Sequence, residues 1–412
     1  MKRREEAVRR ISGPHVDHTR GNSHEPIIVA ECAHIPTAPI EMGVGGAFAC
    51  PASQEGARTR FTAGDGAGRF SRRSLRKRSP PQRTTATAAF TRVDIQTGAW
   101  RFRGHSIRYQ RCGAPTAGGG GPSLVCVHGF GGNCDHWRRN LSELATALPG
   151  SQVFAIDLLG YGYSSKPPPA PGLYSFETFA EQLRAFQDEV VRDESGVFLV
   201  CNSVGGVAGL QAALDAASDA GGPGAKAVRG VVLLNVSHRG LHVSKQPPPL
   251  RPLIAAFQWV LRETPLGQSF FGAVATPQAV QNVLRQAYCD PAQVTDELVE
   301  CILRPGLEPG ASAVFLDFIS YSSGPLPERQ LEALSAAAGR ATPVAVVWGR
   351  EDPWESVQLA RQNLRDHACV ERFVELPGVG HCPQDEAPQL VNPVVVSFVN
   401  DIVATTTPPV PS

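Results

Sequence analysis

No run of apolar residues in the 412-residue sequence approaches the roughly 18–20 that a membrane-spanning helix needs, so the sequence predicts no transmembrane helix. An excess of one charge is also missing, because 39 Lys and Arg stand against 38 Asp and Glu. The resulting net charge of +1 excludes a strongly basic nucleic-acid binder and an acidic disordered protein as descriptions of the whole chain.

The ten cysteines include no C-x-x-C pair and no zinc-like spacing. Several lie inside apolar runs, such as Cys126 in LVCVHGF and Cys201 in FLVCNS. This usage predicts buried free thiols in a reducing compartment and argues against a disulfide framework. The sequence contains no metal-binding motif and no dinucleotide fingerprint either, and we expect no cofactor.

The small net charge hides an uneven distribution. Residues 42–90 contain nine basic and two acidic side chains, a net charge of +7, whereas the chain from residue 91 onward contains 24 basic and 30 acidic ones, a net charge of −6. The stretch FTAGDGAGRFSRRSLRKRSPPQRTTATAAF is rich in Arg and Ser and almost free of acidic residues, as organellar transit peptides are. A solvated basic tail or a nucleic-acid-binding arm would have a similar composition.

We expect residues 1–90 to be a disordered leader with an organellar transit peptide, ending near Ala89–Thr91. Residues 1–41 are charge-balanced and differ in character from the segment that begins at Met42, one of two methionines. Our hypothesis is that Met42 is a real or alternative start. A peptide from residues 1–41 in the mass spectrum of the endogenous protein would contradict it.

From Trp100 onward, short apolar segments alternate with helical patterns, which predicts a mostly parallel sheet with helices on both faces. An antiparallel pair is expected around Trp100–Tyr109. The expected core strands are 123–129, 153–160, 196–203, 228–236, 343–349 and 371–378. The expected helices of the core are Phe176–Arg192, Val204–Ala217 and Pro393–Val403.

About a hundred residues between two of these strands show helical patterns without strand alternation. We interpret residues 238–341 as a helical cap, with a separate helical domain as the alternative. The core is then made of residues 91–237 and 342–403, and residues 404–412 are expected to form a disordered tail.

The candidate nucleophile is Ser203 in FLVCNSVGGVAGLQAA, where a strand ends and a helix of small residues begins. Small residues around such a serine allow a sharp turn that exposes its hydroxyl, and the helix N-terminus favours developing negative charge. The usual pattern is G-x-S-x-G, and Cys201 replaces its first glycine. Ser203 could instead be a helix cap, and Ser322 in SYSSG matches about as well, but no strand precedes Ser322.

The other two catalytic candidates each follow a later strand. Asp352 in WGREDPW is the candidate acid, with its neighbour Glu351 as a possible substitute, and His381 in GVGHCPQDEAP is the candidate base. Taken alone, Asp352 could be a turn former or a helix cap, and His381 could be a solvated histidine in a loop. Together with Ser203 they provide a nucleophile, a base and a group that orients the base, in the chain order of one known class of serine hydrolases.

The oxyanion donors are expected from the main-chain N–H groups of Phe130, in the loop HGFGGN, and of Val204. His128 and His136 are more easily explained as structural or pocket-lining residues. Ester hydrolysis through an acyl-enzyme follows from this set. A serine at the turn disfavours dehalogenase or epoxide-hydrolase chemistry, in which a carboxylate is the nucleophile.

Four segments give the chain a family resemblance: CNSVGGVAGLQAA, VTDELVECILRPGLEPGASAVFLDFISYSSGPLPE, WGREDPWE and GVGHCPQDEAPQLVNP. Over roughly residues 96–403 the chain resembles the chloroplast α/β-hydrolases that include chlorophyll dephytylase and pheophytinase. The resemblance implies hydrolysis of the phytyl ester of chlorophyll or a derivative, in the plastid stroma or at the thylakoid surface. Cys201 favours the dephytylase type.

A lipophilic ester substrate would need an apolar site and access to the thylakoid membrane surface. Apolar side chains of the expected cap are the candidates for contact with the substrate, and fewer than half need touch it: Phe257, Trp259, Phe270, Phe271, Phe315 and Phe318. We expect peripheral membrane contact through the cap and no nucleic-acid partner. A general plastid lipid or carboxyl ester hydrolase and a receptor without turnover on the same fold remain as alternatives.

Overall fold

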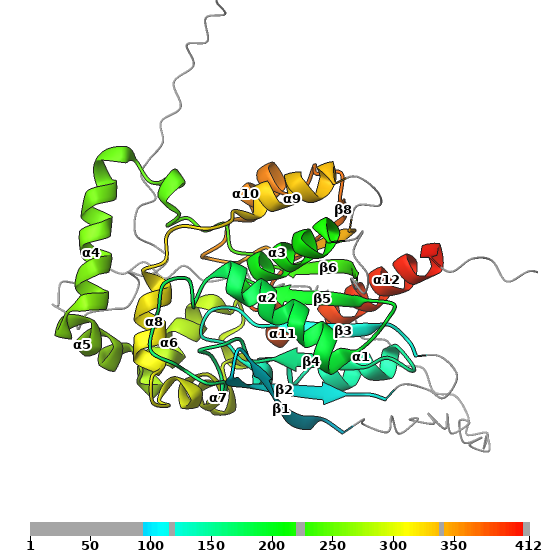
Figure 1. The fold of residues 1–412 in the computed structure, drawn as a ribbon, viewed down its shortest axis with the longest axis horizontal. Coiled ribbons are helices and arrows are strands. Elements are labelled where there is room, and N and C mark those ends of the chain that lie inside the picture. The colour runs from blue at the N-terminus through cyan, green and yellow to red at the C-terminus, as the bar shows by residue number, and fades with distance from the viewer. Residues whose placement is uncertain (1–93, 115–119, 220–226, 338–341, 407–412) are drawn as a thin grey trace, which may run out of the picture.

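The computed structural model describes residues 94–114, 120–219, 227–337 and 342–406, and these form a single eight-stranded sheet flanked by helices (Figure 1). The leader, the proposed start at Met42 and the transit peptide lie outside the described residues. The strands are ordered β1-β2-β4-β3-β5-β6-β7-β8. Their bounds are β1 Gln96–Phe102, β2 His105–Cys112, β3 Ser123–Val127, β4 Val153–Ile156, β5 Val197–Asn202, β6 Val228–Leu234, β7 Val344–Gly349 and β8 Val370–Leu376.

Strand direction follows the expectation from sequence. The β1–β2 and β2–β4 pairs are antiparallel, and every other pair in the sheet is parallel. The residues of β3 and β5 are all buried, as the continuous apolar runs of a two-sided parallel sheet require. The strand expected over 153–160 ends at Ile156, because the chain turns there around the buried side chain of Asp157, whose carboxylate accepts the N–H groups of Cys134 and Tyr163.

Helices cover both faces of the sheet. One face is packed by α2 Phe176–Phe186, α3 Val204–Ser218, α9 Pro327–Ala336 and α10 Val357–Asn363, and the other by α1 Leu141–Ala147 and α12 Pro388–Thr406. The helix expected over Phe176–Arg192 becomes a π-helical segment, η2, at Gln187–Val191. The closing helix starts five residues before Pro393 and extends through residues 404–406, the start of the expected tail.

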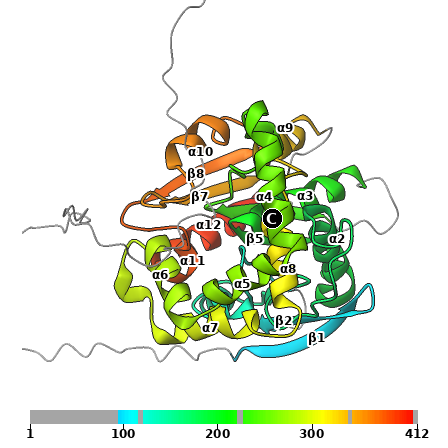
Figure 2. The same ribbon diagram turned by 90° about the vertical axis from the view of Figure 1, so that its left-hand side faces the viewer.

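Among the described residues, five of the six α-helices between β6 and β7 gather at one end of the sheet: α4 Arg251–Glu263, α5 Pro265–Val274, α6 Pro277–Ala287, α7 Asp296–Gly306 and α8 Ala311–Ile319 (Figures 1 and 2). The last helix of the segment expected as cap, α9, packs against α3 instead, where Gln330 Nε2 donates to the Val207 carbonyl at 3.0 Å. The short α11 Pro383–Glu386 precedes α12, and the single-turn helices are η1 Cys134–Trp137, η3 Val243–Lys245, η4 Pro248–Leu250 and η5 Pro291–Gln293.

Six of the eight cysteines among the described residues are buried, and Cys126, Cys134, Cys201, Cys301, Cys369 and Cys382 are free thiols. In this part of the chain no helix is both long and apolar enough to cross a membrane.

Candidate active site

The three catalytic candidates lie in loops that follow different strands of the sheet. Ser203 follows β5, Asp352 follows β7 and His381 follows β8. The carboxyl ends of parallel strands meet at one edge, where α/β proteins gather their functional groups. Ser203 and His381 line one pocket of about 380 Å³ under helices α5–α8.

The backbone at Ser203 is strained into a sharp turn. Its φ of 52° and ψ of −125° lie in a region that residues with a side chain rarely adopt. The turn is fixed by the Ser203 N–H, which donates to the Leu234 carbonyl of β6 at 3.0 Å. It also needs glycine beyond it, since a Cβ on Gly205 would lie 2.5 Å from the His128 carbonyl oxygen. Ser203 therefore sits at the junction of β5 and α3, facing the pocket.

Cys201, the departure from the usual motif, is fully buried beneath this turn. A Cβ on Gly209 of α3 would lie 2.5 Å from the Cys201 Sγ. Helix α3 can therefore pack closely on β5 only because residue 209 is a glycine. The missing side chain at Gly209 makes room for the extra side chain at Cys201.

His381 and Asp352 form a hydrogen bond between Nδ1 and Oδ2 of 2.7 Å. The Asp352 side chain is completely buried, and its other oxygen accepts the N–H groups of Trp354 and Glu355 at 2.9 and 3.0 Å. Burial alone would raise the pKa of Asp352, but the charge of His381 and the hydrogen bonds from its neighbours lower that pKa below its usual value. An ionised Asp352 places the proton on Nδ1 and leaves Nε2 of His381 as a base.

Two asparagines that the sequence reasoning missed hold this pair in place. Asn235, after β6, donates to Asp352 Oδ2 at 2.7 Å, and its own Oδ1 accepts the Gly349 N–H at 2.8 Å. Asn202, beside the nucleophile candidate, donates to the His381 carbonyl at 3.1 Å. Asn202 ends β5 and Asn235 follows β6, at the carboxyl ends of the strands where the site lies. That position is the sequence signal that could have identified them.

The alternatives weighed from sequence take other places. The Glu351 carboxylate accepts the Gly378 N–H at 2.8 Å and shapes the loop after β8. Ser322 lies in the loop between α8 and α9, where its carbonyl accepts the Val243 N–H at 2.8 Å. Asp352, not Glu351, is the carboxylate that faces His381.

The loop expected to supply oxyanion donors lies directly against Ser203. A Cβ on Gly129 would be 2.9 Å from the Ser203 Cβ, so only glycine allows this approach. Phe130 and Val204 line the pocket, and within the described residues their N–H groups donate to no backbone carbonyl. They are therefore available to a negatively charged oxygen in the pocket.

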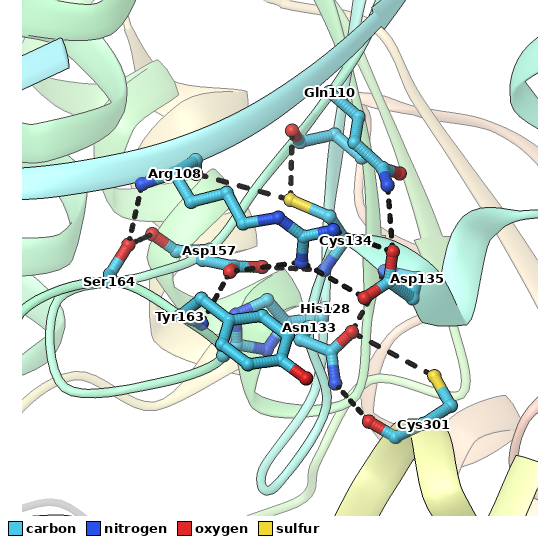
Figure 3. Close-up of polar contacts among 12 residues, drawn as sticks. Arg108, Gln110, His128, Asn133, Cys134, Asp135, Asp157, Tyr163, Ser164 and Cys301 are labelled. Atoms are coloured by element: carbon cyan, nitrogen blue, oxygen red, sulfur yellow. Dashed lines mark hydrogen bonds and ion pairs between the residues drawn. The ribbon is translucent and has the colours of Figure 1, made fainter. Parts of the chain in front are cut away.

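A buried polar network holds this loop at both ends (Figure 3). At its start, His128 Nε2 accepts the Leu158 N–H at 3.0 Å while its Nδ1 contacts the Gly129 carbonyl at 2.8 Å. At its end, the Cys134 N–H donates to Asp157 Oδ1 at 2.6 Å. Two consecutive residues after β4 thus fix residues 129–133, and we call this arrangement the loop clamp.

The clamp extends to strand β2 and to the cap. The Arg108 guanidinium donates from Nη1 to Asp157 Oδ2 at 3.4 Å. It also donates to both carboxylate oxygens of Asp135, at 2.7 and 3.0 Å. Asn133 accepts the Asp135 N–H at 2.8 Å and donates to the Cys301 carbonyl of α7 at 2.8 Å (Figure 3). The loop is therefore tied to a cap helix through one side chain.

His136 lines the pocket, and its Nε2 lies 3.0 Å from Tyr288 Oη. The Tyr288 hydroxyl donates to Asp385 at 2.8 Å, and Asp385 also accepts from Arg138 at 2.7 Å. Since the phenol proton goes to a carboxylate, His136 must donate from Nε2. Burial lowers the pKa of His136 to about 4, so this ring is neutral at neutral pH.

The rest of the pocket is mainly apolar. Of the six cap residues expected to contact a substrate, Phe270, Phe315 and Phe318 line it, and Phe130 packs on Phe315 with ring centres 5.1 Å apart. Phe271 is not among the residues that line the pocket and packs on Phe315, with ring centres 5.3 Å apart. Phe257 and Trp259 are 57% and 55% exposed on α4, away from the pocket.

Comparison with known proteins agrees with this fold. A model of the alpha/beta hydrolase family matches residues 124–394. Chloroplastic pheophytinase of Arabidopsis thaliana is 24% identical over 333 residues, 72% of this chain and 64% of pheophytinase. A dihydrolipoyllysine-residue acetyltransferase component of the acetoin cleaving system of Pseudomonas putida is 28% identical over 68% of this chain and 64% of that protein. The chain thus spans slightly less than two thirds of the length of either relative.

Among solved structures, the unliganded epoxide hydrolase CorEH superposes with a TM-score of 0.57 at 18% identity, over 75% of this chain and 100% of that one. At this identity the likeness concerns the fold alone. The family model, by contrast, covers most of the chain, including the segments that carry Ser203, Asp352 and His381. The chain belongs to the alpha/beta hydrolase family.

Proposed function

We propose that this hydrolase cleaves the phytyl ester of chlorophyll or of a chlorophyll derivative, releasing phytol and chlorophyllide. The observation that carries the proposal is the 2.7 Å hydrogen bond from His381 to a buried Asp352 at the wall of an apolar pocket that also holds Ser203. Those three groups are what serine-based acyl transfer requires. The resemblance of the cap segment and the similarity to pheophytinase support the choice of ester.

In the proposed mechanism, Ser203 Oγ attacks the ester carbonyl while His381 Nε2 accepts the hydroxyl proton. The N–H groups of Phe130 and Val204 stabilise the oxyanion, and phytol leaves with the proton held by His381. Water activated by His381 then releases the acyl group from Ser203. Asp352 remains ionised throughout and stabilises the imidazolium, in keeping with its lowered pKa.

The pocket suits a hydrocarbon chain beside an ester. Its volume of about 380 Å³ is at the lower end of the roughly 300–1,000 Å³ typical of ligand pockets, so it would take only part of a pigment. Burial from water stabilises a hydrocarbon by about 0.8 kcal/mol per CH₂, but a chain that leaves a bilayer gains little of this. Selectivity must then come from the shape of the pocket and its few polar groups.

The substrate can be tested with purified protein, wild type and Ser203→Ala, incubated with chlorophyll a, pheophytin a and a galactolipid. We expect phytol and the dephytylated pigment from at least one pigment, and none from the variant. Preference for pheophytin a would assign a pheophytinase-type activity, and release of fatty acid alone would identify a general plastid lipid or carboxyl ester hydrolase. Ligand binding by Ser203→Ala with unchanged biological output would indicate a receptor, and no product from either pigment would refute the pigment proposal.

We further propose that the protein acts in the chloroplast, on the basis of the Arg- and Ser-rich segment before residue 91. Import of the radiolabelled full chain into isolated chloroplasts should yield a shortened, protease-protected product. A chain that remains full-length and accessible outside the organelle would contradict the proposal.

A further inference from the structure

Helix α4 projects from the molecule at the outer edge of the cap (Figures 1 and 2). It follows the turn η4 and folds back into α5, and it touches the body chiefly through α5 and α8. Only Leu261 on it is buried. The close approach to α5 depends on Gly267, where a Cβ would lie 1.7 Å from the Leu261 carbonyl oxygen. In this helical hairpin, α4 therefore packs tightly against α5 at its end, while most of its surface lies outside the core.

The outward side of this hairpin is apolar. Leu253 is 68% exposed and Leu266 of α5 is 64% exposed, and together with Phe257 and Trp259 they form what we call the cap ridge. At 100° per residue, the three ridge residues of α4 cover roughly 160° of the helix circumference. Four large apolar side chains thus point outward from one hairpin, an uncommon amount of exposed apolar surface in one place.

The ridge is also uncharged. From residue 252 to residue 284 the only charged side chains are Arg262 and Glu263. They form an ion pair with each other, Nε to Oε1, at 2.7 Å. A protein surface that recognises another folded protein usually has a polar rim around its apolar centre. Apart from this pair, whose Glu263 follows Trp259 by one helical turn, the segment carries no charge. Such scarcity of charge matches hydrocarbon better than a protein partner, and Trp and Phe beside aliphatic residues are typical of helices that lie in the bilayer interface.

The same hairpin continues inward to the pocket. Phe270 and Val274 line the cavity that contains Ser203, and they lie on α5, the helix that also carries Leu266 of the ridge. Val280 and Val283 of α6, within the same charge-poor segment, line it as well. An apolar molecule that left a bilayer at the ridge would therefore meet apolar side chains on the way to the pocket.

We propose that the cap ridge, Leu253, Phe257, Trp259 and Leu266, inserts into the surface layer of a lipid bilayer and holds the pocket against it. Docking is driven by burial of these side chains and not by charge. A docked protein could take a lipophilic ester into the pocket without its passage through water. This role in substrate delivery rests on the proposed function, whereas docking itself does not.

The test is flotation of the full chain with vesicles of phosphatidylcholine, comparing wild type with the double variant Phe257→Ser, Trp259→Ser. We expect the variant to lose about a hundredfold in vesicle partitioning, from the burial of two large apolar side chains. Because no charge is involved, raising the salt concentration should leave wild-type binding unchanged. Equal binding by both proteins, or wild-type binding that salt abolishes, would overturn the proposal; the latter would assign binding to the basic leader.

The matched control is Leu359→Ser, Leu390→Ser, which removes two apolar side chains of 43% and 42% exposure on α10 and α12. It should bind vesicles like wild type. If it lost binding equally, the effect would be one of general surface hydrophobicity, against the proposal. Sedimentation without vesicles addresses a second copy of the chain: self-association that the ridge variant abolishes would make the ridge a dimer interface.

Failure of the docking proposal and of the proposed function can be told apart. The flotation comparison is repeated with Ser203→Ala in both proteins, so that vesicle binding is also measured without turnover. With active protein, the ridge variant should hydrolyse p-nitrophenyl butyrate at the wild-type rate but lose at least tenfold in hydrolysis of pigment held in vesicles, given its lost partitioning. Vesicle binding without any pigment hydrolysis would refute the substrate and leave the docking surface standing.

Discussion

At the scale of single residues, the exchange of glycine for Cys201 illustrates how a motif tolerates a departure. Cys201 adds a side chain where the usual pattern has none, and Gly209 provides the room for its sulfur. The two positions belong to one packing contact between β5 and α3. Helix propensity alone would disfavour Gly209, because a glycine in mid-helix costs about 1 kcal/mol relative to alanine. The contact with Cys201 explains why a glycine is there.

We predict that Gly209→Ala destabilises the wild-type chain by about 1–3 kcal/mol, because the new methyl group meets the Cys201 sulfur. In a Cys201→Ala background the nearest remaining atom of residue 201 is its Cβ, at 3.6 Å, an ordinary contact. There the same exchange should be neutral or stabilising, since alanine favours the helix. Urea unfolding of the four proteins measures this, and equal costs of Gly209→Ala in both backgrounds would contradict the packing account.

A second prediction concerns the buried carboxylate. Asp352→Asn keeps the shape of the side chain but removes the charge that fixes the His381 tautomer, so we expect kcat for a soluble ester to fall by about 10⁴-fold. Its neighbour Glu351 binds the Gly378 N–H instead, and Glu351→Gln should remain within a few-fold of wild type. Steady-state rates with p-nitrophenyl butyrate compare the two. The assignment fails if Glu351→Gln is the more damaging exchange.

At the scale of elements, the loop clamp relates the sheet to the chemistry. The residues after β4 hold the loop 129–133 from both ends, and α7 of the cap holds it through Asn133. Oxyanion stabilisation depends on donors fixed in place before the reaction, and a displacement of 1 Å can cost about a hundredfold. In the proposed mechanism the clamp therefore has a positioning role, and none of its side chains need touch the ester.

We predict that Asn133→Ala lowers kcat by about 10–100-fold, with a smaller effect on KM, because a misplaced donor weakens the transition state more than the bound substrate. The affinity for a phosphonate transition-state analogue should fall in parallel. Asp193→Ala is the control, since it removes hydrogen bonds to Ser123 and Ser195 at the opposite end of the strands. If both variants lose stability alike and kcat alike, Asn133 has only a structural role.

At the scale of the whole molecule, buried neutral histidines make stability dependent on pH. Burial lowers the pKa of His136 from 6.5 to about 4, while an unfolded chain titrates near 6.5. Between these values the unfolded state binds a proton that the folded state does not. Stability contributed by this residue is therefore complete above about pH 6.5 and falls as the pH decreases toward 4, by about 3 kcal/mol in total.

His136→Gln keeps a donor for Tyr288 but does not titrate, so its unfolding free energy should decrease less between neutral pH and pH about 4.5 than that of wild type. Denaturant unfolding at each pH provides the measurement. His105→Gln, the same exchange at the partly exposed start of β2, is measured alongside as the control for loss of a histidine. An unchanged slope in His136→Gln would show that other groups cause the loss of stability in acid.

Much of this architecture could be predicted from the chain. Short apolar segments ending in polar residues predicted the strands of a mostly parallel sheet and placed Ser203, Asp352 and His381 after three different strands, whereas the order of the strands came from the structure. The places of Asn202 and Asn235 at the ends of strands could have marked them as site residues, but their roles could not be assigned, because their partners are a main-chain carbonyl and a carboxylate more than a hundred residues away. The outward position of Phe257 and Trp259 was also beyond prediction, since an apolar stripe on a helix looks the same whether it faces a core or a membrane.

The most direct test of the account is labelling of the protein with a fluorophosphonate, which reacts preferentially with an activated serine. We predict modification of the peptide that contains Ser203, no labelling of Ser203→Ala, and labelling slowed at least a hundredfold in His381→Ala because the base is lost. Labelling of another residue, or of Ser203→Ala at the wild-type rate, would contradict the central claim that Ser203, His381 and Asp352 form the catalytic site.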